Sequence, residues 1–174
     1  MISRRAFLKT GAAGALALAL GGAVYRRLNP PAPARPFMLD GAARGVLAAV
    51  VPAMLASALP ADPAARAAAV AATTARVRDA VLALPLATQK EVQDLFGLLA
   101  LAPARRWLAG VSNGWDGAAP QEVHDFLHNW RTHRLATPRI AYLALHDLIL
   151  GAWYADPSTW GAIGYPGPLK ELLA

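Results

Sequence analysis

Apolar residues recur at intervals of three and four from Met38 onward, the spacing that gathers them on one face of a helix. The clearest such face is formed by Val123, Phe126, Leu127 and Trp130. No stretch alternates convincingly between polar and apolar residues, as a half-buried strand would. Proline and glycine divide the pattern into short segments. The sequence therefore predicts an all-α fold, a single small bundle of about five to six helices.

Aspartates followed by helical patterns set the first expected boundaries. Asp40 is expected to cap a helix over residues 41–58, which Pro52 should kink. Asp62, followed by proline, is expected to cap a second helix that runs to about residue 84.

The middle of the chain carries a capping box and a long loop. Thr88 and Glu91 have the capping-box spacing, so a helix is expected to begin at Thr88. Pro103 should interrupt that helix before a short helical turn. Residues 110–119 are rich in turn formers and predict a loop, after which Pro120 opens the next helix.

The last long helix has the most apolar sequence. Thr137 followed by proline predicts its start, and the helix is expected to cover residues 139–154. Its residues are apolar almost all round, which favours a position in the middle of the bundle. Asp156 should cap one more turn after it.

A different pattern occupies the N-terminus. The chain reads Ser3-Arg4-Arg5-Ala6-Phe7-Leu8-Lys9, followed by a glycine- and alanine-rich apolar run. This stretch resembles the twin-arginine export consensus at every position, from the hydroxyl residue through the two arginines to Phe7, Leu8 and Lys9. The 15 residues from Thr10 to Val24 fall short of the ~20 that a spanning helix needs. The resemblance implies export of an already folded protein to the periplasm through the twin-arginine translocase.

The leader is expected to cover residues 1–34, ahead of a helical domain over residues 35–174. Cleavage is expected after Ala34, with retention as an inner-membrane anchor as the alternative. Five of the chain's 17 basic residues and none of its 11 acidic ones lie in the leader. The remainder is thus close to neutral, with 12 basic against 11 acidic residues, so nucleic-acid binding is not expected.

The chain contains no cysteine. This excludes disulfides, thiolate zinc sites, iron–sulfur clusters and covalent haem attachment through cysteine. The sequence also lacks a Gly-x-Ser-x-Gly elbow, a phosphate loop and a nucleotide fingerprint. We therefore expect no cofactor in this chain and no catalysis of its own.

Histidines offer the main alternative. His124 and His128 are four residues apart, a spacing that allows two imidazoles on one helix to share a metal. The glutamate that zinc proteases place beside the first histidine is absent. The alternative hypotheses are a small periplasmic metal-dependent enzyme using His124, His128 and His146, and a stand-alone ligand-binding bundle.

His146 and Asp147 are polar residues within the apolar last helix. A carboxylate in such a position needs a partner. Arg131, Arg134 and Arg139 are close in sequence, at the turn before this helix. We expect Asp147 to pair with one of them and fix the register of the two helices; an acid/base role for His146 and Asp147 is the alternative.

The C-terminal region is aromatic and bounded by proline and glycine. Large rings provide contact area at low entropic cost, which suits an interface. The residues expected at a partner interface are Trp153, Tyr154, Trp160, Tyr165, Pro166, Gly167 and Pro168. Packing within the bundle's own core is the alternative for Trp153 and Trp160.

The chain resembles the twin-arginine-signalled small subunits of glucose–methanol–choline-type flavoprotein dehydrogenases. The resemblance lies in its leader, its size, its helical character and this aromatic ending. The gluconate 2-dehydrogenase small subunit is the named relative. The resemblance implies a large subunit that holds FAD and oxidises an alcohol or sugar acid, and a quinone or c-type cytochrome that takes the electrons. It implies that the small subunit holds no cofactor and escorts the flavoprotein out of the cell.

Overall fold

The computed structural model describes residues 35–167. Within that range every regular element is a helix, which confirms the predicted all-α class. None of the helices in this range combines the length and hydropathy that crossing a bilayer requires. The expected leader, including Ser3, Arg4, Arg5, Phe7, Leu8 and Lys9, lies outside the described residues, and so does Pro168.

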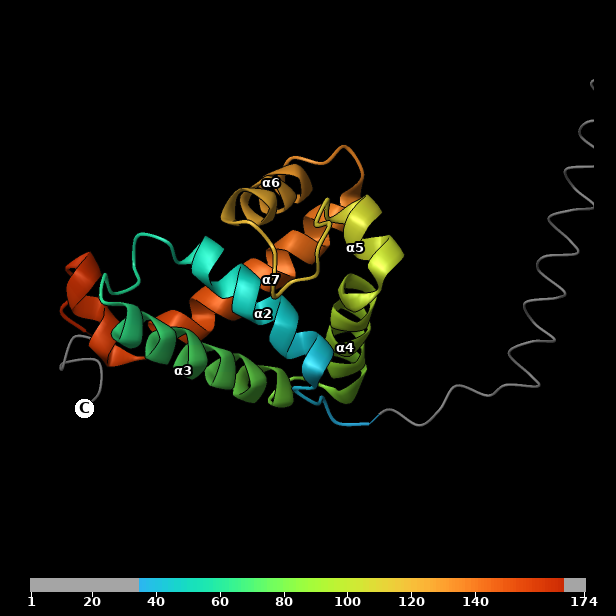
Figure 1. Ribbon diagram of the computed structural model, residues 1–174. Coiled ribbons are helices and arrows are strands. Elements are labelled where there is room, and N and C mark those ends of the chain that lie inside the picture. The colour runs from blue at the N-terminus through green and yellow to red at the C-terminus, as the bar shows by residue number, and fades with distance from the viewer. Residues whose placement is uncertain (1–34, 168–174) are drawn as a thin grey trace, which may run out of the picture. The chain divides into compact units, whose positions relative to one another are not determined.

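Six α-helices and one 3₁₀-helix follow one another along the described chain (Figure 1). They are α2 (Gly41–Met54), α3 (Pro63–Leu82), α4 (Leu86–Ala100), α5 (Ala102–Leu108), α6 (Pro120–Arg131), α7 (Ala136–Tyr154) and η1 (Pro157–Ile163). The expected break at Pro103 and the loop before Pro120 are both present.

Three aspartates cap helices as predicted. Asp40 Oδ1 accepts a hydrogen bond from Ala43 N at 2.9 Å, and Asp62 Oδ2 accepts one from Ala65 N at 2.7 Å. Asp156 Oδ1 accepts from Ser158 N at 2.9 Å at the start of η1. These bonds satisfy backbone donors that have no partner within the helix.

The predicted helix starts at Thr88 and Thr137 were wrong. α4 begins at Leu86, so Thr88 already lies inside the helix and the expected capping box does not form. α7 begins at Ala136, before Thr137, and Pro138 falls in the first turn. Proline is tolerated there because the first backbone N–H groups of a helix have no intrahelical acceptor.

α7, expected in the middle of the bundle, packs against α2, α3, α6 and η1. α2 packs against α3, α4, α6 and α7, and Figure 1 shows it between them. Its buried residues are Ala43, Val46, Leu47, Val50 and Val51. α7 in contrast leaves Ile140 64% and Leu143 53% exposed. α7 therefore carries more apolar residues than its partly buried position requires.

α2 ends at Met54, four residues before the expected end, within one turn of Pro52.

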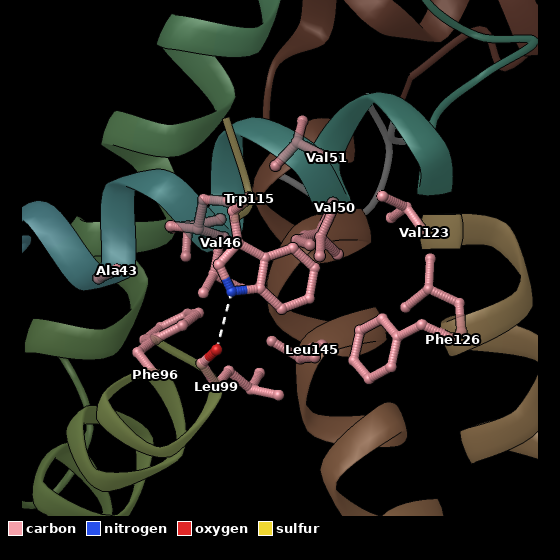
Figure 2. Packing of buried hydrophobic residues seen from close by; sticks show 14 of the residues in the cluster. Ala43, Val46, Val50, Val51, Phe96, Leu99, Trp115, Val123, Phe126 and Leu145 are labelled. Atoms are coloured by element: carbon pink, nitrogen blue, oxygen red, sulfur yellow. Dashed lines mark hydrogen bonds between the residues drawn. The ribbon is translucent and has the colours of Figure 1, made fainter. Parts of the chain in front are cut away.

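Trp115 joins the loop before α6 to the core (Figure 2). Its indole ring packs edge-on against Phe126, with ring centroids 5.6 Å apart. Its Nε1–H donates to the carbonyl oxygen of Leu99 at 2.8 Å, drawn as the dashed line in Figure 2. Leu99 lies in the last turn of α4, where carbonyl groups lack intrahelical donors.

The same arrangement recurs at two other helix ends. Trp130 Nε1 donates to the oxygen of Leu108, the last residue of α5, at 2.9 Å. Trp160 Nε1 donates to the oxygen of Tyr154, the last residue of α7, at 2.7 Å. Three indoles therefore close three helix C-termini from elsewhere in the chain.

A buried glutamine closes the end of α3. Gln89 is 4% exposed, and its Nε2 donates to Leu82 O at 3.1 Å and to Leu84 O at 2.8 Å. Its Oε1 accepts from Phe37 N at 2.9 Å. One side chain thus ties the segment before α2 and the end of α3 to α4.

An ion pair joins α3 to the start of η1. Arg76 pairs with Asp156, and both side chains are partly buried. Hydrogen bonds from Ser158, through its backbone N–H and then its hydroxyl, lower the pKa of Asp156, and the charge of Arg76 lowers it further. The folded protein therefore favours the ionised carboxylate.

Replacing Gln89 with alanine should lower the free energy of unfolding by roughly 2–4 kcal/mol, since three backbone groups lose their partner in a buried site. The matched control is Gln93→Ala, one turn further along α4. Gln93 Oε1 accepts from Met38 N at 2.9 Å, but this bond is exposed, so the cost should stay below about 1 kcal/mol. Guanidinium unfolding of both variants measures the difference, and equal losses would contradict the role given to burial.

Asp156→Asn should destabilise the protein at neutral pH, and the loss relative to the unchanged chain should shrink in acid. A carboxylate with a lowered folded-state pKa stabilises the fold above its unfolded pKa of about 3.9 and loses this effect as the pH falls through the folded value. Thermal unfolding of both proteins at pH 7 and below about pH 3 measures the change. Asp79→Asn, which removes an exposed pair with Arg78, is the control and should have little effect. A difference between Asp156→Asn and the unchanged chain that does not depend on pH would contradict this account.

Candidate functional sites

Trp107 differs from the other four tryptophans. It lies on α5 and is 88% exposed, whereas three of the others close helix ends and Trp153 is 6% exposed in the core. Among the described residues no acceptor lies within hydrogen-bond distance of its indole N–H. Within residues 35–167, Trp107 therefore neither closes a helix end nor packs in the core.

Other apolar side chains surround Trp107 at the surface. Leu98 of α4, Leu108 of α5 and Leu135 before α7 are all exposed and line one hollow of about 790 Å³ with Trp107. We refer to these four residues as the Trp107 face. The face combines two consecutive helices, α4 and α5, with Leu135 from further along the chain, so the fold positions it as one surface.

Polar residues complete the lining of this hollow. They are Asn129, Thr132, His133 and Thr137. Arg134, at the α6–α7 turn, and Arg139, in the first turns of α7, are exposed but do not line the hollow. An apolar centre with a polar rim is the composition of a protein–protein interface.

Only some of the residues predicted for a C-terminal interface are exposed. Trp153 lies in the core, so it cannot serve as an exposed anchor. Trp160 is half-buried, and the exposed ring of Tyr165 packs edge-on against it with centroids 5.1 Å apart. Gly167 has a φ of +95°, and a Cβ there would lie 3.2 Å from the Trp160 ring. The tail thus packs on Trp160. Tyr165 and Pro166 remain exposed, while Tyr154 is half-buried.

Three of the four histidines line a second hollow, of about 250 Å³. His124 and His128 come from α6 and His146 from α7. Arg131 and Tyr142 line it with them, and Ala53 and Met54 of α2 form its apolar side. We call it the histidine hollow. The sequence spacing of His124 and His128 indicated a pair, but the approach of His146 and Arg131 depends on how α6 and α7 pack.

Asp147 does not pair with an arginine. Its side chain is 77% exposed, and its Oδ1 lies 2.9 Å from Nδ1 of His146. Within the described chain, Arg131, Arg134 and Arg139 make no ion pair with it. The prediction assumed that α7 is buried on all sides. Because Asp147 faces water, it needs no buried partner and does not set the register of the helices.

The imidazoles of α6 are stacked rather than convergent. The rings of His124 and His128 are nearly parallel, at 11°, with centroids 6.4 Å apart. No three histidine, aspartate or glutamate side chains in residues 35–167 lie close enough together to hold a metal ion. The proposed metal-dependent chemistry has no supporting ligand set in this part of the chain.

Truncation should separate the two kinds of tryptophan. Trp107→Ala should change the free energy of unfolding by no more than about 0.5 kcal/mol, because the exposed ring makes few contacts. Trp130→Ala should cost about 3–5 kcal/mol, since it leaves a cavity and an unpaired Leu108 carbonyl. Chemical denaturation of both variants tests this, and a large loss for Trp107→Ala would show that the ring supports the fold.

Comparison with known proteins adds no residue to either site. No family model, no curated protein and no solved structure matches this chain. The functional argument therefore rests on the chain's own residues and on the resemblances of its two ends.

Proposed function

We propose that this chain is a non-catalytic small subunit that binds a periplasmic FAD-dependent alcohol or sugar-acid dehydrogenase and escorts it through the twin-arginine translocase. The observation that carries the proposal is the Trp107 face, an apolar surface that residues 35–167 leave exposed. Contiguous exposed apolar surface on a small protein marks an interaction site.

The energetics of the face favour a protein partner. A tryptophan ring buries about 150–250 Å² when fully covered, which at about 25 cal/mol per Å² corresponds to roughly 4–6 kcal/mol before the costs of association. Trp107 is exposed almost completely, so nearly all of this remains to be gained on binding. A tryptophan surrounded by leucines is the composition of an interface hot spot.

The leader specifies when that partner would bind. The N-terminal sequence matches the twin-arginine consensus, which directs the export of folded proteins. The matching residues are Ser3, Arg4, Arg5, Phe7, Leu8 and Lys9. A partner without a signal of its own would have to bind this chain in the cytoplasm and cross the membrane with it. Covering the Trp107 face before export would also remove its apolar surface from water.

The resemblance at the two ends of the chain supplies the identity of the partner. In that group of dehydrogenases the large subunit carries the FAD, and a quinone or a c-type cytochrome accepts the electrons. We therefore place this chain in a periplasmic complex at the inner membrane. Arg134 and Arg139 are exposed and lie close in sequence to Leu135 of the Trp107 face, which fits a partner surface with an apolar centre and acidic residues around it.

The chain carrying a C-terminal tag should retrieve a yellow flavoprotein from the native cell envelope, identified by its absorption spectrum. Trp107→Ala should weaken binding by roughly 30- to 700-fold, the effect of losing about 2–4 kcal/mol at a hot spot. The flavin absorbance of the eluate, relative to the amount of tagged protein, measures the loss.

Tyr165→Ala is the matched control because it truncates an exposed aromatic on the C-terminal surface. It should retain most of the flavoprotein. If Tyr165→Ala loses the partner and Trp107→Ala keeps it, docking occurs on the C-terminal surface and the assignment of the Trp107 face fails. If the unchanged chain elutes alone and colourless, the small-subunit proposal itself fails.

A further inference from the structure

We propose that the histidine hollow binds a small oxyanion, a phosphate or sulfate group, and binds it more tightly as the pH falls. This proposal is independent of the dehydrogenase partner, since the Trp107 face and the histidine hollow have no lining residue in common. It rests on the donors that α6 and α7 bring together.

The polar lining of the hollow consists of hydrogen-bond donors. Arg131 has a guanidinium group, which donates and does not accept, and Tyr142 has a phenolic hydroxyl. His124, His128 and His146 each present ring nitrogens that all become donors once the imidazole is protonated. A planar guanidinium fork matches the geometry of an oxyanion.

Arg131 also decides the sign of the ligand's charge. A permanent positive charge in the lining repels a divalent cation and attracts an anion. The nearly parallel rings of His124 and His128 both line the hollow from one helix. The structure thus assigns to this hollow an anion rather than the metal that the histidine spacing alone suggested.

Carboxylates adjoin the imidazoles without lining the hollow. Asp147 Oδ1 lies 2.9 Å from Nδ1 of His146, and Asp125 Oδ1 lies 3.7 Å from Nδ1 of His124. If Nδ1 of His146 donates to Asp147, the other ring nitrogen can donate to an anion only when the ring is protonated. These two carboxylates offset part of the positive charge, so the hollow is cationic mainly when the histidines are protonated.

The other residues near the hollow change its net charge little. α2 contributes only Ala53 and Met54 to the lining. Arg66 and Asp116 line an adjoining hollow together with His124 and carry opposite charges. Protonated imidazoles add positive charge to the hollow, so a lower pH favours an anion there.

The size of the hollow sets the class of ligand. A volume of about 250 Å³ admits a tetrahedral oxyanion and a short attached group. The same chemistry is available from a free ion and from the headgroup of an anionic lipid. Inorganic phosphate and vesicles of phosphatidylglycerol, compared at equal phosphate concentration, distinguish these two sources.

Sulfate is the first probe because it stays doubly charged from mildly acidic to neutral pH, whereas phosphate changes its own charge. Calorimetric titration of the full chain with sulfate should give an affinity at least about tenfold higher near pH 5.5 than near pH 8. The imidazole proton resonances of His124, His128 and His146 should shift on titration. The resonance of His133, which lines the Trp107 hollow, should not.

Arg131→Gln and His128→Gln should each lower the sulfate affinity near pH 5.5 by about tenfold or more. Arg134→Gln is the matched control, because this exposed arginine lies three residues away and outside the hollow's lining. All three variants change surface positions, and their melting temperatures check that the fold is kept. Equal affinities for Arg131→Gln and Arg134→Gln, or sulfate binding that does not depend on pH, would overturn the proposal.

Discussion

Every α-helix ends with backbone carbonyl groups that have no donor within the helix, and burying such an end requires a donor from elsewhere. In this chain side chains from outside each helix provide these donors, some from the next turn or segment and some from further along the chain. Gln89 closes the end of α3, and the indoles of Trp115, Trp130 and Trp160 close the ends of α4, α5 and α7. Each of these bonds also fixes where one helix lies against the next segment. A chain without cysteine depends on such contacts to hold short helices in place.

The need to close helix ends distinguishes the tryptophans that stabilise the fold from those that are available to bind a partner. An indole that closes a helix end has its N–H occupied, and moving it toward a partner would leave a carbonyl group without its donor. Trp107 has no such bond, is almost fully exposed and is surrounded by leucines from three segments. The histidine hollow lies elsewhere, between α6, α7 and α2, and brings cationic groups together where the Trp107 face is apolar. The two surfaces suit different ligands, a protein and a small anion.

Features that depend on neighbouring residues could be predicted from the sequence. Asp40, Asp62 and Asp156 cap helices within three residues of themselves, and the apolar face of residues 123–130 follows from helical spacing. Features set by packing could not. Thr88 has capping-box spacing, yet it lies inside α4, which begins at Leu86. The next residue, Gln89, makes buried contacts with the end of α3 that the sequence spacing does not indicate.

The candidate sites likewise depend on packing, which the sequence does not show. Trp107 and Trp153 are both tryptophans in apolar segments, and only the fold shows that one is exposed and the other buried. His146 joins His128 because α6 packs on α7, and no spacing in the sequence records this contact. Asp147 was expected to be buried because α7 is apolar, but that side of the helix faces water.

The most direct test of the account is hydrogen–deuterium exchange of the chain, free and in its native complex. If the Trp107 face docks the dehydrogenase, amide protection should increase in residues 98–108 and 132–141, around the hollow that the face lines. Protection that increases only in residues 157–167 would place the partner on the C-terminal surface instead. Exchange that is identical in the free and bound chain would contradict docking through either surface.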